Sequence, residues 1–124
     1  MSIRNGSRGE IVSDLKPLVA DLNASVQFAE RGIVSKTLYE SPAQKLVLFC
    51  FEPGQALSEH TAPFEAVIHV LQGKADVKLG DNVYKATPGA LYVMPAGLAH
   101  AVTARERFVF LLTMTRLSNP AQLK

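Results

Sequence analysis

Cysteine, long apolar runs and clusters of one charge are all scarce in this sequence. The only cysteine among the 124 residues is Cys50, so no disulfide bond can form within the chain. Its neighbours Phe49 and Phe51 are apolar, whereas a reactive thiol needs exposure and a nearby positive charge, so we expect Cys50 to be buried and unreactive. The longest apolar run, residues 46–51, is far too short to cross a bilayer as a helix.

The charged residues form no pattern that points to a polyanionic partner. The formal net charge is +2 at pH 7, and the 13 Lys and Arg residues are scattered along the chain. A nucleic-acid site needs a basic patch, and no helix-turn-helix pattern is present either, so we expect neither nucleic acid nor a membrane as a partner. The first residues also lack the apolar core of a secretory signal, which favours a cytoplasmic location.

The length and composition of the chain are those of one domain. With 124 residues and a 48% hydrophobic composition, the chain can bury a single core. We expect a polar arm with one short helix over residues 1–30, a β-barrel over 31–116 and a tail over 117–124. The helix is expected over residues 13–22, where apolar residues follow a helical spacing: Leu15, Leu18, Val19 and Leu22.

From residue 32 onward the pattern becomes that of short strands separated by turn-forming residues. Ala75, Val77 and Leu79, for example, alternate with polar residues, which predicts one buried and one solvated face. Many short strands with almost no helix predict an all-β barrel or sandwich. Strands are expected near residues 32–39, 44–52, 65–72, 74–79, 82–87, 90–94, 99–104 and 106–115.

Three of these strands are apolar on both faces, at residues 46–51, 66–71 and 108–112. The core of a barrel covers only the inner face of a strand, so an apolar outer face needs a cover of its own. The N-terminal helix could supply part of it, and a second copy of the chain in a symmetric homodimer could supply the rest. The alternative is a monomer in which the chain's own termini cover these strands.

Two stretches, residues 54–73 and 89–100, carry the most specific signal. They contain seven residues at the offsets of a paired motif: Gly54, His60, Gly73, Gly89, Pro95, Gly97 and His100. In these residues the chain resembles the cupin superfamily, whose motifs are G-x5-H-x-H-x3-E-x6-G and G-x5-P-x-G-x2-H-x3-N. The resemblance implies an all-β fold, a double-stranded β-helix or jelly-roll barrel. It also implies that His60 and His100 lie on separate strands of the inner wall, where they would line a pocket for a small molecule.

Three other positions of the paired motif are lost, and two of them are ligand positions. Ala62, Ala66 and Ala104 stand where the motifs have the second histidine, the glutamate and the asparagine. A metal site usually takes three protein ligands, so the two remaining histidines form a degenerate site. Glu65 could complete a site for Fe, Mn, Zn or Ni if a bulge turned it inward, whereas simple strand alternation makes it a carboxylate at the rim.

The activity is therefore left open among several functions. The first is a small-molecule pocket lined by His60 and His100, with or without turnover. The second is a metal-dependent oxygenase, isomerase or decarboxylase that uses these histidines and Glu65 as ligands. The third is a metal-free epimerase or isomerase, with a histidine as the base and Tyr92 as the acid. His69 is expected on the face away from the pocket, hydrogen-bonded in the sheet or at a subunit interface.

Overall fold

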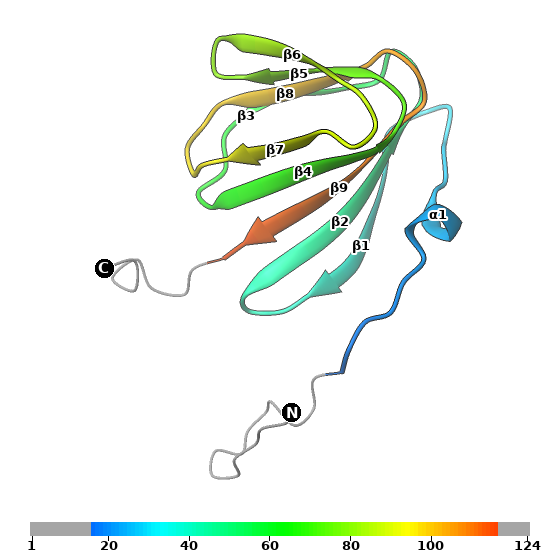
Figure 1. The fold of residues 1–124 in the computed structure, drawn as a ribbon, viewed down its shortest axis with the longest axis vertical. Coiled ribbons are helices and arrows are strands. Elements are labelled where there is room, and N and C mark those ends of the chain that lie inside the picture. The colour runs from blue at the N-terminus through cyan, green and yellow to red at the C-terminus, as the bar shows by residue number, and fades with distance from the viewer. Residues whose placement is uncertain (1–15, 117–124) are drawn as a thin grey trace.

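The computed structural model describes residues 16–116, which form one short helix and nine strands (Figure 1). The helix is α1 (Leu22–Ser25). The strands are β1 (Val34–Glu40), β2 (Gln44–Phe51), β3 (Ala56–His60), β4 (Glu65–Gln72), β5 (Ala75–Leu79), β6 (Asn82–Ala86), β7 (Leu91–Met94), β8 (His100–Ala104) and β9 (Phe108–Thr115). The expected arm before residue 16 and the tail over 117–124 lie outside the described residues.

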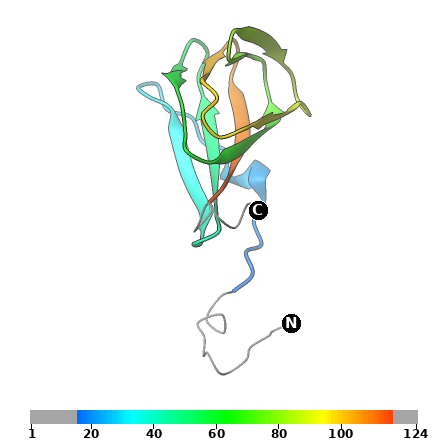
Figure 2. The ribbon, with the colours of Figure 1, turned by 90° about the vertical axis from the view of Figure 1, so that its left-hand side faces the viewer.

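The strands form two antiparallel sheets that face each other (Figures 1 and 2). One sheet has five strands in the order β1-β2-β9-β4-β7, and the other has four in the order β3-β8-β5-β6. Neighbours in each sheet are mostly distant in the sequence, so the chain passes repeatedly from one sheet to the other. This all-β jelly-roll architecture confirms the predicted fold class.

The main core lies between the two sheets. Alternation in β5 places the fully buried Val77 inside and the polar Lys78 outside. Phe51, Phe108 and Phe110 are also fully buried there, and their ring centroids lie 5.7–5.9 Å apart. Each of these rings contributes about 2–3 kcal/mol by leaving water, which makes this cluster the main anchor of the five-stranded sheet.

All eight predicted strands are present, and a ninth, β3, was not predicted. Leu57 is the only residue of β3 that packs against the main core, and the other four residues are exposed. A strand at the edge of a sheet with so little buried surface gives no clear alternation in its sequence. The omission matters, because β3 ends with His60.

The helix exists but is shorter and later than predicted. Residues 16–20 are not helical, and α1 begins only after Asp21, whose side-chain Oδ1 accepts a 3.3 Å hydrogen bond from the Ala24 N–H. Pro17, which lacks an N–H, disfavours helix inside the predicted span unless it stands in the first turn. The prediction over residues 13–22 is therefore wrong for residues 16–21 and right only for Leu22, and residues 13–15 lie outside the described part of the chain.

A second, smaller core lies on the outer face of the five-stranded sheet. Leu48, Cys50 and Val109 are fully buried there, and the partly buried Val26 and Phe28 pack against them. Val26 and Phe28 belong to residues 26–32, which we call the N-terminal strap. The strap confirms that Cys50 is buried, and it covers part of the outer face that the sequence predicted to need a cover.

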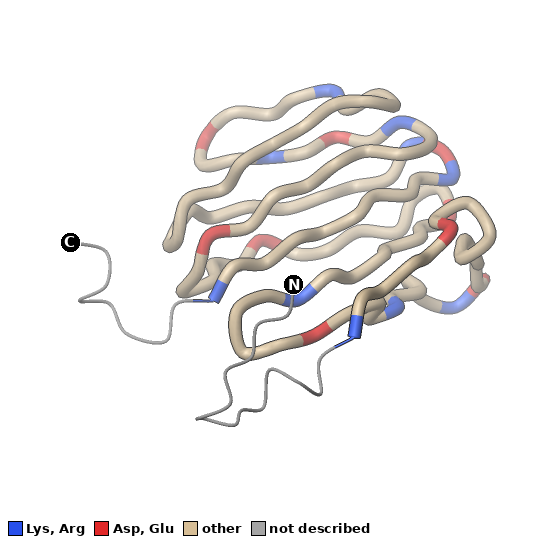
Figure 3. The backbone as a smooth tube through the Cα atoms, turned by 60° about the horizontal axis from the view of Figure 1, so that its bottom comes forward, with Lys and Arg blue, Asp and Glu red and all other residues tan. Residues whose placement is uncertain are grey.

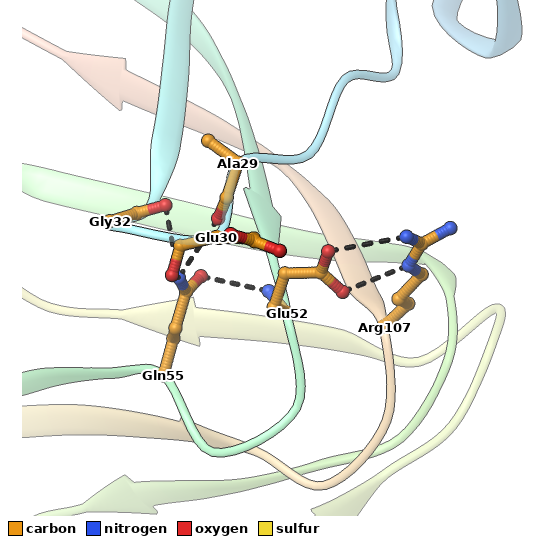
Figure 4. A network of polar contacts seen from close by, with 6 residues as sticks. All are labelled: Ala29, Glu30, Gly32, Glu52, Gln55 and Arg107. Atoms are coloured by element: carbon orange, nitrogen blue, oxygen red, sulfur yellow. Dashed lines mark hydrogen bonds and ion pairs between the residues drawn. The ribbon is translucent and has the colours of Figure 1, made fainter.

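The strap is held by a network around Gln55 (Figure 4). The side-chain Nε2 of Gln55 donates to the carbonyl oxygens of Ala29 and Gly32 at 3.1 and 3.0 Å, and its Oε1 accepts from the Glu52 N–H at 2.8 Å. The Glu52 carboxylate in turn binds Arg107, whose guanidinium lies 4.6 Å from the centroid of the Phe28 ring. One glutamine thus joins the strap to the loop between β2 and β3.

Residues of both charges are interspersed along the backbone of the described part of the chain (Figure 3). Asp76, for example, accepts hydrogen bonds from Arg105 and pairs with Lys85 at 3.5 Å. The hydrogen bonds from Arg105 hold the pKa of Asp76 below its usual range. No helix within residues 16–116 is long and apolar enough to cross a membrane.

Candidate functional site

His60 lies on β3, the edge strand of the four-stranded sheet, and His100 lies on its neighbour β8. The two residues pair directly across these strands. Their alignment depends on a shift of register in β3. Leu57 pairs with Val102, two residues from His100, whereas three residues separate Leu57 from His60. In a regular strand, a separation of three residues would place Leu57 and His60 on opposite faces. The register shift is a β-bulge that absorbs the extra residue. The bulge therefore turns His60 to the inner face, beside His100.

The two imidazole rings are in contact. Their centroids lie 4.2 Å apart and the ring planes are inclined by 64°, an edge-to-face arrangement. His60 is exposed and His100 is partly buried. The pair is therefore accessible to solvent rather than sealed in the core, so a molecule from solvent can reach it.

Each ring is oriented by the same local hydrogen bond. Nδ1 of His60 lies 2.8 Å from the Ser58 carbonyl oxygen, and Nδ1 of His100 lies 2.9 Å from that of Leu98. A carbonyl oxygen only accepts, so both Nδ1 atoms carry a hydrogen. In the neutral form of each ring, Nε2 is then the nitrogen that keeps a lone pair for a ligand. Two rings fixed in the same tautomer form a preorganised pair of acceptors.

The loops beside the pair are tied together. The backbone N–H of Gly97 donates a 2.8 Å hydrogen bond to the carbonyl of Ala62, which joins the turn before β8 to the loop after β3. Gly97 has a φ of 84°, a conformation that glycine adopts without strain. This contact gives a structural role to the motif residue Gly97 and to Ala62, which stands at the position of the lost histidine. It also fixes the end of the barrel at which the histidines lie, which we call the histidine end.

Glu65 is not assembled with the histidine pair. It is exposed at the start of β4, and the next residue, Ala66, is buried on the inner face. The register of β4 against β9 is regular from Glu65 to Val70, so no bulge turns this carboxylate inward. Within residues 16–116, no three His, Cys, Asp or Glu side chains are grouped so that they could hold a metal ion. Glu65 as a third ligand remains a prediction.

Tyr92 lies on the inner face of β7, opposite Ile68 of β4. Its ring contacts that of Tyr84, with the centroids 5.9 Å apart, where β6 and β7 face each other. Burial, and then the neighbouring Tyr84, raise the pKa of Tyr92, which keeps its hydroxyl protonated at neutral pH. β6 and β8 are separated by β5, so this tyrosine pair lies on the other side of the barrel from the histidine pair.

His69 lies on the outer face of the five-stranded sheet, as its position relative to Ala66 predicted. It is exposed, and its partners across the sheet are Leu91 of β7 and Leu111 of β9. This third histidine is therefore separated from the pair by the full thickness of the sheet, and it serves as a natural control for experiments on the pair.

The histidine pair could be predicted from the sequence, but its surroundings could not. At the histidine end, Lys45 of β2 lies on the inner face because it alternates with Val47 and Phe49. A lysine at the start of an apolar strand usually lies in solvent, so no pattern in the sequence singles out Lys45. The register of β2 against β9 is what identifies it.

Comparison with known proteins agrees with this geometry. The cupin domain model matches residues 47–114, which contain both histidines. A conserved protein of unknown function from Streptococcus pyogenes is 30% identical, with a TM-score of 0.74 over 82% of this chain and 89% of its own. An RmlC-like cupin from Desulfovibrio desulfuricans is 31% identical, with a TM-score of 0.74 over 81% of this chain and 97% of its own.

A cupin superfamily protein from Desulfitobacterium hafniense is 26% identical, with a TM-score of 0.74 over 82% of this chain and 96% of its own. No curated protein matched the sequence. The family model spans more than half of the chain, and the two-sheet barrel carries the motif histidines on its inner face. This protein belongs to the cupin family.

Proposed function

We propose that this cupin binds a small molecule at the histidine end of its barrel, through the Nε2 atoms of His60 and His100. The observation that carries the proposal is the pair itself. Two imidazoles from different strands are in contact, and each is held by a backbone carbonyl so that its second nitrogen is free. Converging polar groups at the mouth of an apolar barrel are typical of a ligand site.

The proposal predicts that His60 and His100 are both needed for tight binding and that His69 is not. We would screen a library of small metabolites by NMR, using protein with ¹⁵N-labelled histidine, and follow the ring nitrogens. Ligands are expected to change the ¹⁵N chemical shifts of the Nε2 atoms of both His60 and His100. Replacing either one with alanine should weaken binding about tenfold, the effect of losing one hydrogen bond in a preorganised site.

His69→Ala is the matched control, because it removes an imidazole from the outer face and should leave the affinity unchanged. Ligands that bind equally well to the wild type and to both pair variants would contradict the proposed site. Far-UV circular dichroism of each variant establishes that the barrel is folded.

A metal-dependent enzyme is the alternative that a specific observation favours. Histidine ligands to metals usually donate their other ring N–H to a carbonyl or carboxylate, as both rings of the pair do here. His60 and His100 could therefore hold Fe, Mn, Zn or Ni through Nε2, with water or the bound molecule completing the shell. Such an ion would polarise a bound oxygen atom as a Lewis acid. Equimolar metal in protein prepared without chelator, lost in both His60→Ala and His100→Ala, would support this alternative.

Metal-free epimerase or isomerase chemistry has less support. A histidine of the pair could act as a general base, because imidazole exchanges protons near neutral pH. The proposed acid, Tyr92, has its ring against Tyr84 on the other side of the barrel, so a substrate would have to reach across the inner space to contact both.

We also propose a cytoplasmic homodimer that forms through the outer face of the five-stranded sheet. The strap covers this face over β2 and β9, but Leu91 and Val93 of β7 are 61% and 53% exposed. These side chains extend the apolar surface beyond the strap, towards Val67 and Leu111. A second copy would remove this surface from water.

The dimer predicts a strong effect of charge at Leu91. Leu91→Asp would bury a carboxylate in the interface, so light scattering should show a shift from dimer to monomer. Val83→Asp is the matched control, because Val83 is 57% exposed on the outer face of the other sheet and should leave the dimer intact. A wild-type mass equal to that of the monomer would contradict the proposed dimer.

A further inference from the structure

At the histidine end, one positively charged residue, Lys45, lies on the inner face of the barrel. Lys45 lies on the inner face of β2, opposite Met114 of β9, and its strand begins at the same end at which β9 finishes. The two sheets of such a fold pack about 10 Å apart, a gap that a lysine side chain can span in large part. Lys45 is therefore the cation placed to reach a molecule held by the pair.

The acids at this end are directed elsewhere or already paired. Glu59 binds Lys78 at 2.9 Å on the outer face, and Glu65 is on the outer face of β4. Glu59 raises the pKa of Lys78, and Asp81, exposed in the turn between β5 and β6, adds to this effect. Glu40 is the one acid beside Lys45, and its carboxylate accepts a 2.7 Å hydrogen bond from Arg116. The hydrogen bond from Arg116 and the charge of Lys45 both hold the pKa of Glu40 below its usual range. One carboxylate thus interacts with two cations where β1 ends and β2 begins, so Glu40 does not neutralise both Lys45 and Arg116.

The two histidines and Lys45 suit a ligand that carries two different polar groups. Neutral imidazoles with a free Nε2 accept hydrogen bonds, so they suit a ligand hydroxyl. An ammonium group only donates, so Lys45 suits a carboxylate. A phosphate would be better served by a free guanidinium or by a helix N-terminus, and Arg116 is already bound to Glu40.

We infer that the ligand of this cupin is a small hydroxy acid, whose hydroxyl donates to the histidine pair and whose carboxylate binds Lys45. This inference rests on the proposed small-molecule site and names the chemical class that the site takes. It assigns Lys45 as a residue that determines specificity.

The test compares three hydroxy acids with analogues that each lack one feature. Lactate, malate and mandelate would be titrated, as both enantiomers, into ¹⁵N-histidine-labelled protein. Lactamide, malamide and mandelamide keep the hydroxyl without the carboxylate, whereas propionate, succinate and phenylacetate keep the carboxylate without the hydroxyl. At least one hydroxy acid is expected to shift both Nε2 atoms and to bind about tenfold more tightly than either analogue, a difference of about 1.4 kcal/mol.

Lys45→Met keeps the length of the side chain and removes its charge. We expect it to weaken binding of the hydroxy acid about tenfold and to abolish the preference over the amide, while Lys45→Arg restores that preference. Lys74→Met is the matched control, because Lys74 is exposed at the opposite end, where β5 begins. His100→Ala should instead abolish the preference over the acid without a hydroxyl.

The outcomes separate this inference from the proposed function. Amides that bind as tightly as the acids, an unchanged affinity in Lys45→Met, or hydroxy acids that shift neither imidazole would overturn the inference. The proposed site would still stand if library ligands of another class shift both Nε2 atoms and lose affinity in the histidine variants. Ligands of any class that bind independently of both histidines would overturn the two together.

Discussion

Replacing Gly73 with alanine is expected to lower the free energy of unfolding by about 3 kcal/mol or more. Gly73 forms the turn between β4 and β5 with a φ of 81°, which an alanine adopts only with strain. A Cβ atom at this position would also overlap the backbone carbonyl of Arg107, which precedes β9. Backbone cannot rotate away as a side chain can, so the two connections would have to separate. Urea unfolding followed by circular dichroism measures the loss.

Gly89→Ala is the control that separates the overlap with the Arg107 carbonyl from the strain of a positive φ. Gly89 has a similar φ of 92°, but a Cβ atom built there meets nothing within 4 Å. Its replacement should therefore cost only the strain of the positive φ, about 1 kcal/mol. Equal losses in the two variants would show that the contact with Arg107 is not what requires glycine at residue 73.

Replacing Gln55 with alanine is expected to increase the reactivity of Cys50 towards a thiol reagent about 30-fold. Gln55 is the residue that holds the strap, and the strap covers the otherwise buried Cys50. Losing these hydrogen bonds should make opening of the strap about 2 kcal/mol easier, and labelling through local opening rises in proportion. Because Cys50 is the only cysteine, the absorbance of released thiol reports on this one position.

Gln72→Ala provides the matched control for this experiment, since Gln72 is an exposed glutamine at the end of β4. Its labelling rate should equal that of the wild type. If Gln55→Ala also labels at the wild-type rate, then the contacts of the strap with Val109 and Leu48, and not the glutamine network, hold it closed. Phe28→Ala would then be expected to carry the effect.

The fold could be predicted from the sequence because hydrophobic alternation and flanking turn residues indicate the same boundaries in most strands. β5 shows both alternation and flanking turn residues, so its position and its inner face were predicted together. β3 lacks the alternation, because only Leu57 packs against the core. The helix was misplaced because Leu18 and Val19 follow a helical spacing, although the chain around them has no face of the barrel to pack against, and Val19 is 94% exposed.

The site was predicted in part, and the reason lies in registers that only the folded chain reveals. The motif identified both histidines, but nothing in the residues between Leu57 and His60 announces the bulge that aligns them. The outward position of Glu65 followed correctly from alternation in β4. Lys45 could not be found, because β2 is apolar on both faces, and only its pairing with β9, a strand far away in the sequence, shows which of its residues point inward.

The most direct test of the histidine site is the tautomeric state and contact of its two rings, measured by ¹⁵N-resolved NMR with neutral imidazoles. If the account is correct, His60 and His100 both carry their proton on Nδ1, with Nε2 unprotonated, and their ring protons show a mutual nuclear Overhauser effect. A proton on Nε2 in either ring, or no magnetisation transfer between them, would contradict a preorganised pair of acceptors.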